Sequence, residues 1–177
     1  MRKISTRLAA AVVSSVILAG ASFAQSPKLT DPEIASVAVT ANQIDISYAK
    51  IAKEKSKNAE VLKFADNMMT DHQAVIDQAV ALVTKLKVTP KDNDVSKKLL
   101  ADAESTKKML NSKSAKDFDK AYVDNEVAYH KAVISTVQNV LIAQAQNAEL
   151  KALLEKVMPI LKSHLEHAEM VQKNLSK

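Results

Sequence analysis

The sequence predicts an all-α protein built as a bundle of long amphipathic helices. Ala, Lys, Leu and Val dominate the composition, and Gly20 is the only glycine among the 177 residues. Apolar residues recur at intervals of three and four along most of the chain, which is typical of helices with one buried face. A chain with so little glycine lacks the usual residue of tight β-hairpin turns. It also lacks the glycine-rich loops that bind phosphates and dinucleotides.

The first residues have the features of an export signal. Three basic residues precede an apolar stretch at 8–20, and small residues follow just before Gln25. We therefore expect residues 1–24 to be a cleaved signal peptide, 25–29 a short tail, and 30–177 a single four-helix bundle domain. The apolar stretch is too short to span a bilayer, and no later run is long and free of charge. The mature chain is expected to have no membrane span and to be periplasmic or secreted.

The charge pattern gives no sign of nucleic-acid binding. The formal net charge is +5, but the signal peptide holds three basic residues and no acidic one, which leaves 22 basic residues against 20 acidic ones. These charges are interspersed, and the chain has no Trp, so a basic surface with stacking platforms is not expected. The absence of cysteine excludes disulfides and thiolate metal ligands. With no cysteine and no serine on a strained turn, the sequence gives little support for an enzyme that uses a nucleophile.

The first pair of helices is bounded by clear capping signals. Thr30 and Glu33 have the spacing of a capping box, which predicts a helix over 31–55. Asn58 caps a second helix predicted over 58–87, which ends because Pro90 disfavours the helical conformation in the residue before it.

A long connector, residues 88–114, then precedes a second pair of helices. The connector contains a shorter, polar helix near 94–110, which we expect on the outside of the bundle. Ser114 caps a helix predicted over 115–145, and Asn147 caps one predicted over 148–175. Pro159 lies inside this last helix and is expected to kink it or to open one hydrogen bond. Four methionines on the apolar stripes are expected to be core filler: Met68, Met69, Met158 and Met170.

A weak internal repeat indicates how the two pairs are related. The tripeptide Asn-Ala-Glu at 58–60 leads through an apolar helix to His72, and the same tripeptide at 147–149 leads to His164. Two similar hairpins joined by a long connector form the plan of a ferritin-like four-helix bundle. The connector is long enough to cross the bundle, so the expected order is up-down-down-up.

All four histidines fall on the predicted core stripes. Counted from the hairpin turns at ~1.5 Å per residue, His72, His130, His164 and Asp45 all lie ~18–27 Å from a turn, near the middle of the bundle. Three imidazoles and one carboxylate, one from each main helix, are therefore expected to converge. Nitrogen and oxygen donors without thiolate suit a divalent transition metal such as Zn, Cu, Fe or Mn. Glu126 and His167, each one turn from a member of this set, could add ligands.

Two other interpretations of these residues remain open. Buried histidines often do no more than hydrogen-bond a neighbouring polar group, so the set could be a purely structural layer. Met69, one turn before His72, could act as a thioether ligand to copper, although core packing is the simpler role. The alternative function is a non-catalytic structural or stress-related periplasmic bundle that acts through its surface. An exposed apolar face on the connector helix would favour that alternative.

Three motifs together resemble a known family of bacterial envelope proteins, catalogued as domain of unknown function 4142. They are Met-Met-Thr-Asp-His at 68–72, Phe-Asp-Lys-Ala-Tyr at 118–122, and Met-Pro-Ile-Leu-Lys-Ser-His-Leu at 158–165. The resemblance covers about residues 31–174. It implies a ferritin-like fold, with an acidic residue in the first helix and one histidine in each of the next three. Asp45 stands where the family pattern leads us to expect a glutamate, and the resemblance implies no established reaction.

Overall fold

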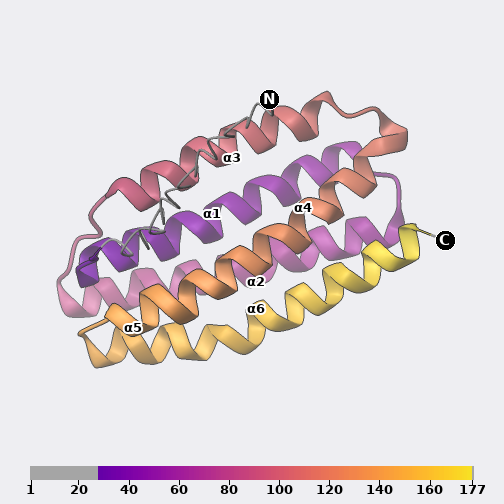
Figure 1. Ribbon diagram of the computed structural model, residues 1–177. Helices are drawn as coiled ribbons and strands as arrows, with labels where there is room; N and C mark the ends of the chain where they lie inside the picture. Colours follow the sequence, from indigo (N-terminus) through magenta and orange to yellow (C-terminus); the bar gives the residue numbers. More distant parts are fainter. Residues whose placement is uncertain (1–27, 177) are drawn as a thin grey trace, which may run out of the picture.

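The structure is a computed structural model that describes residues 28–176. All regular secondary structure in that range is helical, and the range contains no strand. The predicted signal peptide and most of the predicted tail lie outside the described residues. Five long helices follow one another, with a π-helical segment and one short helix before the last (Figure 1). They are α1 (Asp31–Lys55), α2 (Ala59–Leu86), α3 (Asp94–Ser112), α4 (Ala115–Thr136), η1 (Val137–Leu141), α5 (Ile142–Gln144) and α6 (Ala148–Leu175).

The predicted helix caps at the two repeats are confirmed, and they use the same chemistry. The side chain of Asn58 accepts hydrogen bonds from the amides of Glu60 and Val61, at 2.9 and 3.3 Å. Asn147 accepts the corresponding bonds from Glu149 and Leu150, at 2.9 and 3.0 Å. Each pair satisfies two of the amide groups that a helix leaves without partners at its start. The repeated tripeptide is therefore a repeated cap.

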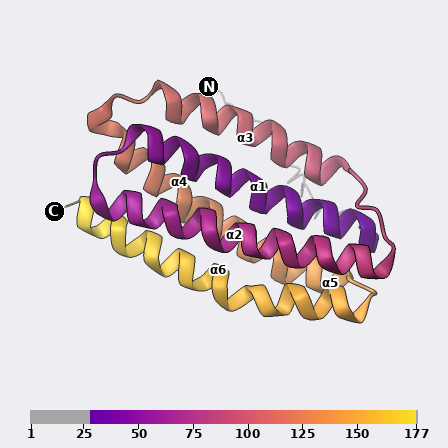
Figure 2. The same cartoon turned by 180° about the vertical axis from the view of Figure 1, so that it is seen from behind.

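The helices pack as two antiparallel pairs. α1 lies along α2, α4 lies along α6, and the pairs meet where α2 packs on α6 and α1 packs on α4. α3 carries the chain back along the length of the molecule on the outer side of α1, so α2 and α4 run in the same direction (Figures 1 and 2). The expected outer position of the connector helix is thus observed. None of the described helices has an apolar stretch of the length needed to cross a bilayer.

The helix predicted over 115–145 is not uniform, contrary to expectation. The α-helix ends at Thr136, five residues form η1, and a single turn, α5, ends at Gln144. A π turn accommodates one extra residue without ending the helix, so a three- and four-residue periodicity does not reveal it. By contrast, α6 continues through Pro159. The missing amide hydrogen of this proline removes one backbone hydrogen bond but does not end the helix.

Two apolar clusters fill the interior and leave a polar layer between them. One cluster lies toward the α1–α2 turn and includes Phe64, Phe118 and Tyr122, all fully buried. The other lies toward the opposite end and includes Ile34 and Leu141. Along α2, α4 and α6, the histidines described below occupy the positions where one cluster ends and the other begins. The four-helix core is therefore apolar at both ends and polar in the middle.

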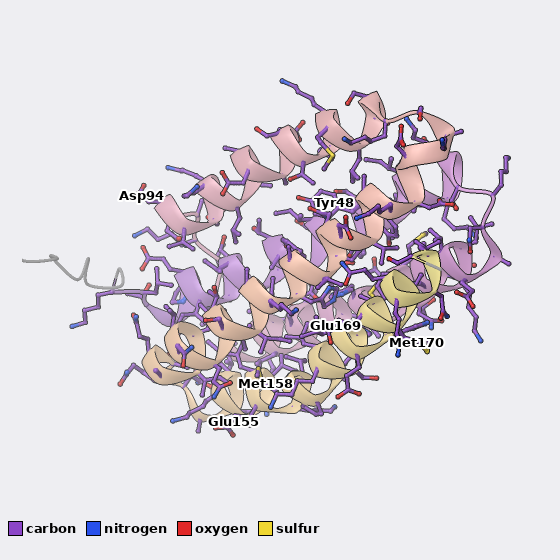
Figure 3. All side chains as sticks on the ribbon, turned by 45° about the vertical axis from the view of Figure 1, so that its right-hand side comes forward. Tyr48, Asp94, Glu155, Met158, Glu169 and Met170 are labelled. Carbon is purple, nitrogen blue, oxygen red and sulfur yellow. The ribbon has the colours of Figure 1, made fainter. Side chains whose placement is uncertain are left out.

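The methionine prediction is right for Met68 and wrong for Met170. Met68 is fully buried, Met69 and Met158 are half-buried, and Met170 is 54% exposed. Figure 3 labels Met158 and Met170 on α6. Ala168 and Val171 take the inward positions of that turn of α6, so the two residues between them, Glu169 and Met170, face outward.

Candidate metal centre

Five ionisable side chains meet in the middle layer, contributed by four helices. Asp45 comes from α1, His72 from α2, Glu126 and His130 from α4, and His164 from α6. Asp45 and Glu126 are completely buried, and the three histidines are at most 5% exposed. Buried groups of this kind need partners, because an unpaired polar group in an apolar interior is costly.

The three imidazole rings form a compact triangle. Ring centroids are 5.7 Å apart for His72 and His130, 5.0 Å for His72 and His164, and 5.5 Å for His130 and His164. One ring nitrogen from each lies within 4.8 Å of the corresponding nitrogens of the other two. The structure therefore brings together the three histidines that the sequence placed at one height.

The hydrogen bond made by His72 determines which of its nitrogens carries the proton. Nδ1 of His72 lies 2.7 Å from Oδ1 of Asn42. The amide nitrogen of Asn42 donates to the carbonyl of Ala38 at 2.8 Å, which fixes the orientation of the amide. Asn42 must therefore accept from His72, so Nδ1 carries the proton and Nε2 keeps a lone pair.

The same reasoning applies to the other two histidines. Nδ1 of His130 lies 3.0 Å from the main-chain carbonyl of Glu126, which can only accept, so Nε2 keeps its lone pair. Nε2 of His164 lies 2.9 Å from a carboxylate oxygen of Asp71 and donates to it, so here Nδ1 keeps the lone pair. The three nitrogens with lone pairs are the ones that are buried without a hydrogen-bond partner.

This pattern is the one that protein metal sites use to orient histidine ligands. A ligating histidine donates its other N–H group to a carboxylate, a main-chain carbonyl or a similar acceptor, which fixes the tautomer and the ring orientation. Here the acceptors are the Asn42 amide, the Glu126 carbonyl and the Asp71 carboxylate. The described residues thus present three oriented nitrogen donors to one another without a proton between them.

Asp45 lies beside two of these nitrogens. Its Oδ2 is 3.4 Å from Nε2 of His72 and 3.6 Å from Nε2 of His130. Both oxygens of Asp45 are buried without a hydrogen-bond partner, as are both oxygens of Glu126. Asp45, Glu126 and His130 also form a second group whose ligand atoms lie within 4.8 Å of one another. Oε2 of Glu126 lies 3.6 Å from Nδ1 of His130, the nitrogen that donates to the Glu126 carbonyl.

Burial decides the ionisation of this layer. It lowers the pKa of His130 to about 4 and holds the pKa of His72 well below its usual range, where the neighbouring histidines add to the effect. It raises the pKa of Asp45 to about 8, and it raises the pKa of Glu126, where the nearby Asp45 carboxylate adds to the effect. His72 and His130 are therefore neutral at pH 7, which is the form that binds metals, and the carboxyl pair retains a proton.

His167 does not join the cluster. Its ring packs edge-on against Phe64, with centroids 5.1 Å apart, one helical turn beyond His164. It is half-buried and belongs to neither ligand group among the described residues. Of the two additional candidate ligands, Glu126 therefore lies in the buried layer, whereas His167 lies outside it.

Sequence reasoning missed two residues that orient the histidines, Asn42 and Asp71. Asn42 lies one turn before Asp45 on α1, and Asp71 immediately precedes His72 but contacts His164. Asn42 could have been found from the sequence, because it is a polar residue one helical turn from Asp45, a predicted ligand. Nothing in the local pattern links Asp71 to a histidine 93 positions away.

Comparison with known proteins gives a family but no function. No curated protein and no solved structure matches the chain. A family model described as "Domain of unknown function (DUF4142)" matches residues 18–171, which includes every residue of the buried layer. The chain therefore belongs to the DUF4142 family.

Proposed function

We propose that this protein is an exported cell-envelope protein that binds one divalent first-row transition metal in the middle of its helical bundle. The observation that supports this function best is the set of three buried imidazole nitrogens that keep their lone pairs. Asp45 supplies a fourth donor, and the three histidines and this carboxylate give an N₃O set. Such a set suits Zn, Cu(II), Fe or Mn better than the hard cations Mg²⁺ and Ca²⁺, which prefer oxygen ligands only.

The ligands need only a small movement to close on an ion. A tetrahedral ion that binds imidazole at ~2.0–2.1 Å holds its nitrogens about 3.4 Å apart. One nitrogen of each ring lies within 4.8 Å of a nitrogen of each of the other two, so each ring needs to move by about 1 Å or less toward the centre. The ion would also offset the cost of burying the two carboxylates, because a nearby divalent cation favours their ionised form. Metal binding should therefore release the proton that Asp45 and Glu126 retain.

The ferritin-like, up-down-down-up arrangement is part of this proposal, but an iron-oxidising diiron centre is not. The parallel course of α2 and α4 and the long connector between them support the arrangement. Diiron sites of that architecture use Glu-x-x-His on two helices. Here Met69 and Leu161 occupy the positions three residues before His72 and His164. A single-ion site for metal binding or handling fits the donors better.

The alternative function, a structural or stress-related bundle that acts through its surface, has less support. An exposed apolar face on the connector helix would favour it. On α3, Leu100 is the single large apolar residue that is strongly exposed, at 48%. Isolated apolar residues are ordinary on protein surfaces and do not indicate a binding face.

Metal binding can be tested with protein purified without a histidine tag, stripped with a chelator, and titrated with Zn, Cu, Fe or Mn. An ion that binds only the folded state adds about 2.7 kcal/mol at a concentration 100 times its Kd. For a domain of this size that stabilisation raises Tm by roughly 5–10 °C. His130→Ala should abolish the shift, whereas His167→Ala, which removes an imidazole outside the cluster, should retain it.

Elemental analysis gives the stoichiometry, expected at one ion per chain for the wild type and for His167→Ala. If none of the four metals shifts Tm, or if His130→Ala and His167→Ala respond alike, the histidines form a structural layer and the metal proposal fails.

Export into the periplasm is a separate part of the proposal. It rests on the basic, apolar and small-residue segments that precede Gln25. The intact mass of protein from the periplasmic fraction should correspond to a chain that begins at Gln25. A mass that includes residues 1–24 would instead indicate an uncleaved N-terminal segment.

A further inference from the structure

A long, largely apolar cavity adjoins the polar layer. It has a volume of about 270 Å³. Its lining includes Asp45, His72, His130 and His164 of the layer, reaches Tyr48 and Thr106 on one side of it, and extends further on the other side, toward the end of the bundle that holds α5. On α2 the lining extends from His72 to Val83, which is about 16 Å along the helix axis. The cavity is thus long, and most of its length lies on the α5 side of the candidate ligands.

The walls beyond the layer are almost entirely hydrocarbon. Val75, Ile76, Ala79 and Leu82 contribute from α2, and valines, leucines and alanines contribute from the other helices. Protein interiors are packed about as densely as organic crystals and contain few voids larger than a water molecule. A continuous apolar cavity lowers stability, because the lining atoms lose contacts. Its presence beside an oriented polar cluster is what a ligand-binding cavity requires.

The cavity reaches the surface between α3 and α4. Part of its lining on that side is accessible to solvent: Asp102 on α3 and Ala128 on α4 are exposed, and Thr106 is half-exposed. Tyr48, which also lines the cavity, lies between the α3 and α4 ribbons in Figure 3. A ligand could therefore enter beside the connector helix.

We propose that this cavity binds a single linear hydrocarbon chain whose oxygen-bearing head, a carboxylate, lies at the His72–His130–His164 cluster. A cavity of ~150 Å³ accommodates benzene, so 270 Å³ suits a chain of about ten carbon atoms. On α1 the lining extends from Ala35 to Tyr48, about 20 Å along the helix axis, and a site of this length suits one extended chain better than compact fused rings. The placement of the carboxylate head depends on the proposed metal ion, which would offset its negative charge. Binding of the hydrocarbon chain in the apolar part of the cavity does not depend on that ion.

The test uses a series of probes on zinc-loaded and metal-free full-length protein, with binding measured by titration calorimetry. The probes are acetate, hexanoate, decanoate and 1-decanol. With zinc bound, each added methylene between hexanoate and decanoate should tighten binding roughly threefold to fourfold, the gain expected for burying a methylene. 1-Decanol, which needs no metal, should bind the metal-free protein.

A matched pair of variants on α2 locates the site. Ala79 lines the cavity two turns beyond His72, whereas Ala81 is exposed on the same helix and does not line it. Ala79→Leu fills the middle of the cavity and should weaken decanoate and 1-decanol binding at least tenfold while leaving zinc binding unchanged. Ala81→Leu should change neither. Thermal melts of both variants check that each folds.

The outcomes separate this inference from the metal proposal. If zinc binds but 1-decanol does not, or if decanoate binds no more tightly than acetate, the cavity is not a hydrocarbon site and the inference is overturned. Equal affinity of Ala79→Leu and Ala81→Leu for 1-decanol would also overturn it. If zinc does not bind but 1-decanol does, with the expected loss in Ala79→Leu, the hydrocarbon site stands and the metal proposal fails with its head-group placement.

Discussion

Removing the carboxylate of Asp71 should weaken metal binding without unfolding the protein. Asp71 accepts a hydrogen bond from Nε2 of His164 at 2.9 Å, and this bond leaves the lone pair on Nδ1, which is buried without a hydrogen-bond partner. Asp71 itself is half-exposed, with 48% of its side chain accessible to solvent, so its loss leaves no cavity. Its role in the proposed site is thus to hold the tautomer and orientation of His164.

The expected magnitude follows from that role. Loss of a group that orients a ligating histidine typically costs 10- to 100-fold in metal affinity, which corresponds to about 1.4–2.7 kcal/mol. The effect on the stability of the metal-free protein should be smaller, about 1 kcal/mol, because water can replace the half-exposed carboxylate as the acceptor of this hydrogen bond. Asp71→Ala should show the full loss of affinity. Asp71→Asn should show less, because its amide oxygen can still accept a hydrogen bond.

The assay is a competition between the protein and a chromophoric chelator of known affinity for zinc, followed by urea unfolding of the metal-free protein. Asp77→Ala is the matched control, since Asp77 is exposed on the same helix and bonds only Gln73 among the described contacts. If Asp71→Ala retains the wild-type Kd to within threefold, the tautomer assignment of His164 is wrong. If Asp77→Ala loses as much zinc affinity as Asp71→Ala, the affinity depends on the negative charge of α2 and not on the hydrogen bond to His164.

Three further outcomes are expected. In the metal-free protein, burial keeps a proton on Asp45 up to pH about 8 that the unfolded chain has already lost, so this group lowers the free energy of unfolding by about 1–2 kcal/mol between pH 6.5 and 8. His72 and His130, which are buried as neutral rings, oppose this fall by about 0.4 kcal/mol each, because the unfolded imidazoles still bind part of a proton near pH 6.5, and the net fall should be about 1 kcal/mol. The fall should disappear in Asp45→Asn, as followed by urea unfolding. Phe64→Ala should cost about 3–5 kcal/mol in the same assay, because the ring is fully buried, and a cost below 1 kcal/mol would contradict the packing. If α2 and α4 are parallel, spin labels at Lys63 and Lys116 should lie closer together than labels at Lys63 and Ser135, and the reverse order would contradict the up-down-down-up arrangement.

Local sequence signals were sufficient for the starts of the helices and for their inward faces, but not for the π-helical segment after α4. The Asn-Ala-Glu tripeptide predicts a helix start because the asparagine side chain satisfies amides only two and three residues away. The inward face of each helix follows from apolar periodicity, so His72, His130 and His164 could be placed on core stripes and at a common height. These features depend on contacts within a few residues of one another, which a single sequence records directly.

The roles of individual atoms were decided by tertiary structure. Whether His164 presents Nδ1 or Nε2 depends on Asp71, which lies on another helix, and whether His72 keeps a lone pair depends on Asn42. Glu126 was expected as a ligand one layer away, yet it is fully buried beside Asp45. These relations depend on how helices rotate and slide against one another by about 1 Å, whereas periodicity locates a residue only to within one step of about 1.5 Å and 100°. The cavity could not be predicted for the same reason. Periodicity shows that a side chain points inward, but it does not show whether side chains from opposite helices are in contact or leave a space between them.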